Sequence, residues 1–155
     1  MKIIICSFLF IFSLSAWSFP KLGDFVRFEA EFQGDLYRLE KKVIDHNSST
    51  DQFTVRTLVL VNNEIVQDQT HELPRSFLYT PEKVDNVFKT CVAREGALGD
   101  IKIEGRPLRV CEFYNEDSQM TYMIGKVPFG QVRFQIYLKD EDFLDFNLKR
   151  FVHGE

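Results

Sequence analysis

Apolar and polar side chains alternate in one segment after another from residue 24 onward, and this period of two constrains the fold more than any other feature. In DFVRFEAEF, residues 24–32, Val26, Phe28, Ala30 and Phe32 fall on one side and charged residues fall on the other. Successive side chains of a strand point to opposite faces, so the pattern is typical of a half-buried β-strand. Similar segments joined by short turns predict a mostly antiparallel sheet of about eight strands.

Two of the segments depart from clean alternation. LYRLEKKVIDH, residues 36–46, alternates less regularly, and its predicted inward set is Tyr37, Leu39 and Val43. EIVQDQTHEL, residues 64–73, is more polar, which favours a strand at an edge of the sheet.

One segment changes the period from two to between three and four. Thr80, Pro81 and Glu82 are residues that favour the start of a helix. An apolar stripe follows, and Gly96 is the predicted end; the stripe comprises Val84, Val87, Phe88, Cys91 and Val92. We expect an α+β domain in which a curved, half-barrel-like sheet packs on this one amphipathic helix.

The first eighteen residues have the composition of a secretory signal peptide. Lys2 precedes a nearly continuous apolar run, and Ala16 and Ser18 provide small residues near a cleavage site. We expect cleavage near Ser18–Phe19, a periplasmic or secreted protein, and a single domain over residues 19–155. The alternative is an uncleaved membrane anchor, for which the run is short.

Two cysteines remain after such a cleavage, Cys91 and Cys111. In an oxidising compartment an isolated pair favours one disulfide, which here would join the helix to a strand. A redox or nucleophilic thiol is the alternative, but the chain has no Cys-x-x-Cys motif.

Of the 16 phenylalanines, 13 lie after residue 18, and most of these are in the inward register. They could fill a core or line a cavity for an apolar ligand. The predicted ligand-lining residues are Phe28, Phe32, Val55, Phe88, Phe134 and Phe146.

GKVPFGQV, residues 125–132, joins two predicted strands. Pro128 fixes one backbone angle and Gly130 can adopt left-handed angles, so we interpret the segment as a structural corner. Lys126 and the backbone amides offer a weak anion site as the alternative.

Four segments in order carry a resemblance to known proteins: KTCVAREG, DIKIEGRPLRVCEF, MTYMIGKVPFGQVRF and LKRFVHG, within residues 80–154. They combine a helix cysteine, a strand cysteine and a V-P-F-G-x-V motif. The chain thereby resembles small secreted proteins of Gram-negative bacteria, some of them predatory, that have no established activity. In outline it is also similar to LolA-type and LppX-type half-barrels, in which an antiparallel sheet curls around helices and holds lipid. This second resemblance implies a lipid-holding fold, although a fold does not fix a function.

Several chemistries find no support in the sequence. The net charge of −4 gives no electrostatic basis for binding nucleic acid. His46, His71 and His153 lack metal-ligand spacing, and no cofactor motif or nucleophile elbow is present. We therefore expect no metal, no cofactor and no catalytic residues.

The sequence favours a non-catalytic protein that binds an apolar or lipid-like molecule between sheet and helix. The alternative is an envelope structural or protein-interaction module, with another envelope protein as partner and a filled core.

Overall fold

The computed structural model describes residues 20–116, 119–137 and 143–154. The predicted signal segment, residues 1–18, and the turn at residues 139–142 lie outside them. The strands are β1 (Phe25–Phe32), β2 (Asp35–Asn47), β3 (Gln52–Val61), β4 (Glu64–Pro74), β5 (Ala97–Ile103), β6 (Arg106–Asn115), β7 (Met120–Gly125), β8 (Gln131–Tyr137) and β9 (Phe143–Val152). The helical segments are η1 (Arg75–Phe77), α1 (Pro81–Thr90) and η2 (Val92–Arg94).

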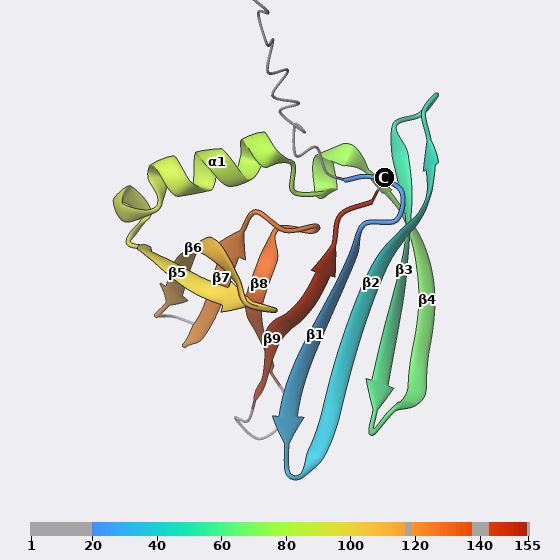
Figure 1. Cartoon of the computed structure of the whole chain (residues 1–155), viewed down its shortest axis with the longest axis horizontal. Helices are drawn as coiled ribbons and strands as arrows, with labels where there is room; N and C mark the ends of the chain where they lie inside the picture. Colours follow the sequence, from blue (N-terminus) through green and yellow to red (C-terminus); the bar gives the residue numbers. More distant parts are fainter. Residues whose placement is uncertain (1–19, 117–118, 138–142, 155) are drawn as a thin grey trace, which may run out of the picture.

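All nine strands belong to one antiparallel sheet in the order β4-β3-β2-β1-β9-β8-β7-β6-β5 (Figure 1). Neighbours in sequence are mostly neighbours in the sheet, as short turns require. The exception is the pairing of β1 with β9, which joins the first four strands to the last five. The sheet is open, because β4 and β5 lie at its two edges.

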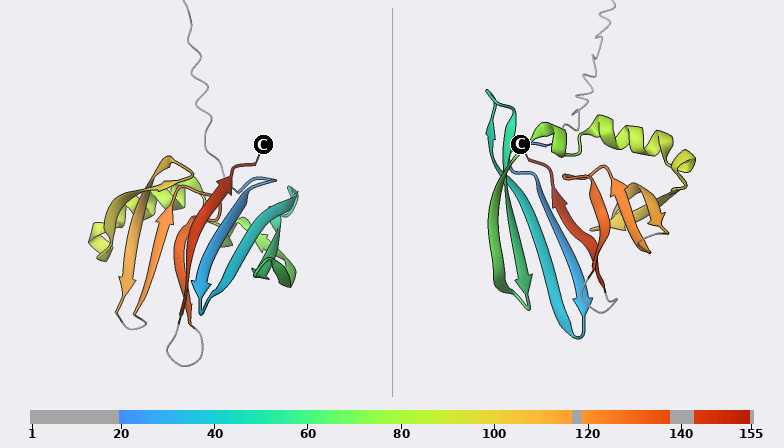
Figure 2. Two further views of the ribbon diagram at one scale, coloured as in Figure 1. Left: turned by 60° about the horizontal axis from the view of Figure 1, so that its bottom comes forward. Right: turned by 180° about the vertical axis from the view of Figure 1, so that it is seen from behind.

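The sheet bends strongly (Figure 2). Its own side chains fill the bend. Register shifts interrupt the pairing of β1 with β9, β2 with β3, β3 with β4 and β7 with β8. Such bulges increase local twist and bend the strands. The main core therefore contains side chains from both halves of the sheet, among them Val26, Phe28, Leu39, Ile103, Leu108, Val132, Phe146 and Phe151.

The helix lies outside this main core. Leu108 and Val110 of β6 belong to the main core, whereas Cys111 and Phe113 belong to a smaller cluster with Val84 and Val87 of α1, and with Ile124 of β7. Alternate residues of a strand face opposite sides, so α1 covers the face of β6 opposite the main core.

The predicted half-barrel of about eight strands packed on one amphipathic helix is therefore wrong. The chain forms an open sheet of nine strands, and the ten residues of α1 cover only part of it. The sheet needs no helix in its bend because apolar side chains from β1, β2 and β9 already occupy that space.

The predicted pair of cysteines is confirmed. Cys91, directly after α1, forms a disulfide with Cys111 of β6, and their Cα atoms are 6.0 Å apart. This bond is consistent with an oxidising compartment. In the part of the chain that the structure describes, no helix is long and apolar enough to cross a lipid bilayer.

Candidate functional site

A cleft of about 310 Å³ opens beside the inward face of β2, β3 and β4. The opposite wall comes from η1, the two residues after it, and the segment that joins β7 to β8. Its lining is predominantly apolar and consists of Lys41, Val55, Thr57, His71, Leu73, Phe77, Leu78, Tyr79, Phe129 and Gln131. We call this space the Lys41 cleft.

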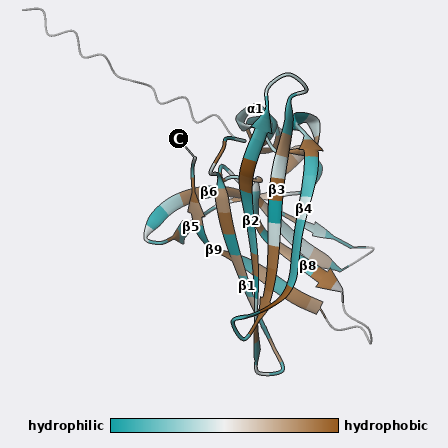
Figure 3. Cartoon of the chain, turned by 90° about the vertical axis from the view of Figure 1, so that its right-hand side faces the viewer, coloured by the Kyte–Doolittle hydropathy of each residue, from teal (hydrophilic) through white to brown (hydrophobic). Residues whose placement is uncertain are grey.

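Strand alternation places the residues of one wall. Lys41 pairs with Thr57 across β2 and β3, and Val43 pairs with Val55. Val55 pairs in turn with His71 of β4. Because paired residues share a face of a sheet, these side chains point to the same side. Figure 3 shows hydrophilic and hydrophobic residues on β2 and β3, and a mostly hydrophilic β4.

Lys41 is the unusual member of this wall. Its side chain lies on the same face of β2 as those of Leu39 and Val43, which are 9% and 0% exposed. Burial lowers the pKa of the Lys41 ammonium, since removal from water disfavours the charged form. Among the described residues, the Nζ atom of Lys41 makes one hydrogen bond, which it donates to the Oε1 atom of Gln131 at 3.5 Å.

The loop between β7 and β8 supplies the facing wall. Val127 and Pro128 are buried, and the loop closes with a hydrogen bond from the Gly125 amide to the Gly130 carbonyl, 2.8 Å long. Phe129 and Gln131 then line the cleft. The loop is a corner between two strands, as predicted, and it also contributes side chains to the candidate site.

A second cleft of about 570 Å³ lies between α1 and β6, and it is more open to solvent. Phe88, Pro107 and Leu108 provide its apolar surface, and an ion pair of 2.6 Å joins Lys126 to Asp85 at its border. We favour the Lys41 cleft because it is less open and holds a partly buried charge among apolar side chains.

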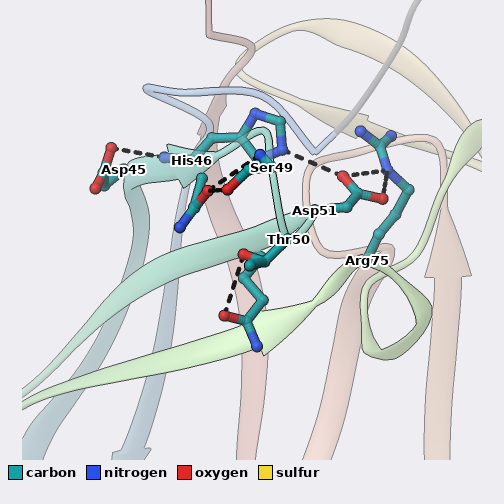
Figure 4. Close-up of polar contacts among 8 residues, drawn as sticks. Asp45, His46, Ser49, Thr50, Asp51 and Arg75 are labelled. Carbon is teal, nitrogen blue, oxygen red and sulfur yellow. Dashed lines mark hydrogen bonds and ion pairs between the residues drawn. The ribbon is translucent and has the colours of Figure 1, made fainter.

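A polar cluster at the turn between β2 and β3 is the remaining candidate (Figure 4). Asp51 accepts a hydrogen bond of 2.9 Å from Arg75 and lies 3.2 Å from the Nε2 atom of His46. Hydrogen bonds from Arg75 and His46 hold the pKa of Asp51 below its usual value. The Ser49 hydroxyl donates to Asn47, at 2.6 Å.

This cluster has a structural explanation. The His46 ring stacks on Phe53 with centroids 4.1 Å apart, and the Arg75 guanidinium lies 5.2 Å from the same ring. Asp51 thus joins the turn to η1 beside the ring of Phe53, which is buried under His46 and Arg75. The cluster fixes η1, and η1 carries Phe77 to the rim of the Lys41 cleft.

The six predicted ligand-lining residues are divided between the two clefts and the main core. Val55 lines the Lys41 cleft and Phe88 lines the second cleft. Phe134 makes an edge contact with Phe28 and a stacked contact with Phe146, with centroids 5.0 Å and 5.3 Å apart.

Phe32 packs against the main core. Phe32 and the three phenylalanines of the preceding paragraph line neither of the two clefts. Contact between a ligand and any of the six residues stays a prediction.

Sequence reasoning missed Lys41, Gln131 and the aromatic rim. A signal for Lys41 was present, because it occupies the inward phase between Leu39 and Val43 and so breaks the alternation of residues 36–46. Phe77, Tyr79 and Phe129 lie in connecting segments, where no periodicity assigns a side to a residue.

Comparison with known proteins adds no family. No model of a known protein family matches the chain, and no curated protein sequence matches it significantly.

Proposed function

We propose that the protein is a non-catalytic binding protein that holds one small apolar or lipid-like molecule in the Lys41 cleft. The observation that carries this proposal is a mostly apolar cleft that the side chains leave unfilled, although the core beside it is closely packed. Ligand pockets typically measure roughly 300 to 1,000 Å³ and are lined mainly by apolar groups. At about 310 Å³ the cleft suits a single acyl chain better than a two-chain lipid.

The proposed ligand is driven into the cleft by burial of apolar surface. Each Å² removed from water contributes about 25 cal/mol. Phe77 at the rim is 76% exposed, so a ligand that covers its ring would gain further apolar contact.

The test measures fluorescence of the neutral probe N-phenylnaphthylamine as it is titrated into the protein. The wild-type chain should give saturable enhancement. Thr57→Phe places a ring in the cleft and should weaken binding by about tenfold or more, which corresponds to about 1.4 kcal/mol.

Thr54→Phe is the matched control. Thr54 lies on the same strand but on the opposite face, because it is an odd number of residues from Thr57. This variant should bind the probe as the wild type does. Equal binding by all three proteins would place the probe elsewhere and overturn the proposal.

The proposed location is the periplasm or the exterior of the cell, after removal of residues 1–18. The apolar N-terminal run, the disulfide and the resemblance to small secreted proteins support it. Mass spectrometry of the exported protein should find a chain that starts at Phe19. A chain that retains the first eighteen residues would contradict this location.

The alternative is a protein-interaction module of the cell envelope. It is favoured by Ile65 and Val66 on the edge strand β4, which are 60% and 61% exposed. Unbound main-chain groups of an edge strand can pair with another chain. Equal binding of the probe to the wild type and to Thr57→Phe would favour the protein-interaction module over the ligand-binding protein.

A further inference from the structure

Lys41 occupies a position that the sheet otherwise gives to apolar or neutral side chains. In the row of paired residues across the sheet, Val26 of β1 lies on one side of Lys41 and Thr57 of β3 lies on the other. Leu39 and Val43, two residues away along β2, are buried. The long side chain of Lys41 therefore extends over the concave face, into the cleft that it lines.

No carboxylate balances this charge within the cleft. The ten lining residues include neither aspartate nor glutamate, and among the described residues no ion pair to Lys41 is formed within 4.0 Å. Several arginines on this sheet have acidic partners, such as Arg56 with Asp68 and Arg133 with Asp145. A partly buried ammonium without a counter-charge is destabilising, so its presence on the wall of the cleft points to a ligand that supplies the charge.

The remaining polar groups of the cleft indicate the kind of anion. Thr57 offers a hydroxyl donor beside Lys41, and the Gln131 side chain already lies 3.5 Å from Nζ and can present its amide group as a donor. One ammonium with these two neutral donors beside it matches a singly charged group with two acceptor oxygens. His71 and Tyr79 are the other polar residues of the lining. A phosphate monoester carries more charge and would need further cationic partners.

The apolar groups lie around this polar end. Val55, Leu73, Leu78 and Phe129 line the same cleft, so a bound molecule meets both a charge and an apolar surface. This combination fits an amphiphile and does not fit a small inorganic anion.

We propose that the Lys41 cleft binds a single-chain amphiphile with a carboxylate head group, and that Lys41 forms the ion pair with that carboxylate. This inference rests on the proposed function, and adds to it the chemical class of the ligand and the residue that selects it.

The experiment displaces N-phenylnaphthylamine with three ten-carbon competitors that differ only in the head group: decanoate, decanol and decyl phosphate. All are tested below their critical micelle concentrations at neutral pH, where decanoate is ionised. Wild-type protein should bind decanoate about tenfold more tightly than decanol, and more tightly than decyl phosphate.

Lys41→Met keeps the length of the side chain and removes its charge. It should bind the neutral probe as well as the wild type does, but bind decanoate no better than decanol. Lys42→Met is the matched control, because Lys42 is exposed and faces the other side of β2. It should keep the tenfold preference.

Folding of Lys41→Met is checked by urea unfolding. Its midpoint should be no lower than that of the wild type, since methionine replaces a desolvated charge in apolar surroundings. Loss of decanoate preference in a folded Lys41→Met variant, with the preference kept in Lys42→Met, supports the inference.

The outcomes separate the two proposals. Wild-type protein that binds the probe and decanol but shows no preference for decanoate overturns the head-group inference and leaves the proposed function standing. Preference for decyl phosphate also overturns it. Failure of the wild type to bind the neutral probe or any competitor overturns both.

Discussion

Two consecutive residues of the loop beside the Lys41 cleft, Phe129 and Gly130, have left-handed backbone angles. Phe129 has φ of 64° and Gly130 has φ of 69°. For a side chain other than glycine, such a conformation costs about 1–2 kcal/mol. The burial of Val127 and Pro128 and the hydrogen bonds of the loop hold Phe129 in place.

Glycine at position 130 is required for two separate reasons. Its φ disfavours any other residue, and a Cβ atom there would collide with the ring of Tyr79. Tyr79 and the neighbouring Phe129 both line the Lys41 cleft. A side chain at position 130 would therefore also change the shape of the candidate site.

Gly130→Ala should lower the free energy of unfolding by about 2 kcal/mol or more, because backbone strain and the collision add together. Gly105→Ala is the control: Gly105 has φ of 78°, and a Cβ there would meet nothing within 4 Å. It should cost only about 1 kcal/mol. Urea unfolding of both variants measures the difference, and equal losses would refute the role assigned to Tyr79.

At the scale of elements, α1 depends on its attachments. Thr80 accepts a hydrogen bond from the Lys83 amide at 3.4 Å, Pro81 begins the helix, and Glu82 lies in its first turn. A helix of ten residues is marginal on its own in water. Its stability therefore comes from packing of Val84 and Val87 and from the disulfide that follows it.

Reduction of the Cys91–Cys111 disulfide should lower the free energy of unfolding by about 3 kcal/mol, because the bond closes a loop with a sequence separation of 20 residues. We also expect reduction to speed the exchange of amide hydrogens in α1 by a larger factor than in β2, because the helix can then open locally. Hydrogen exchange with and without dithiothreitol measures both.

The control for this prediction is the double variant Cys91→Ala/Cys111→Ala, whose stability should not respond to dithiothreitol. Loss of protection that is equal in α1 and β2 would show that the disulfide stabilises the whole sheet rather than the helix.

At the scale of the whole molecule, the two ends of the described chain meet. Asp24 is 1% exposed and accepts hydrogen bonds from the Lys21 amide at 2.7 Å and the Gly154 amide at 2.8 Å. Burial raises the pKa of Asp24 and lowers the pKa of His153 beside it, because both groups are less stable charged when removed from water.

His153 should make stability depend on pH just below neutrality. Its folded-state pKa lies below 6.5, so the unfolded chain binds a proton first as the pH falls. The stabilising effect of the neutral ring is therefore complete above pH 6.5 and is lost as the pH falls toward the folded-state pKa. From about pH 7.5 to about pH 5.5, wild type should lose roughly 0.5 kcal/mol more than His153→Gln, a small value because the ring is partly exposed.

Urea unfolding of both proteins across this range measures the effect. His46 and His71 are present in both proteins, so their titration cancels in the difference. A difference that is constant with pH, or one that grows in the opposite direction, would contradict the effect assigned to His153.

The sequence by itself determined the strands, the start of the helix, the cysteine pair and the corner at residues 125–130. Each of these is local, or depends on residue type: alternation assigns faces within a strand, and Thr80 with Pro81 favours a helix start wherever they occur. The alternation of β6 even separated Leu108 and Val110 from Cys111 and Phe113.

Only the tertiary structure decided where those faces meet. The pairing of β1 with β9, the position of α1 outside the bend, and the approach of Lys41 to Gln131, 90 residues later, depend on sheet order and on bulges. Alternation repeats every two residues along any strand and carries no information about which distant strand comes to lie opposite it. For that reason the candidate site could not be assembled from the sequence, although its central lysine interrupts the pattern of β2.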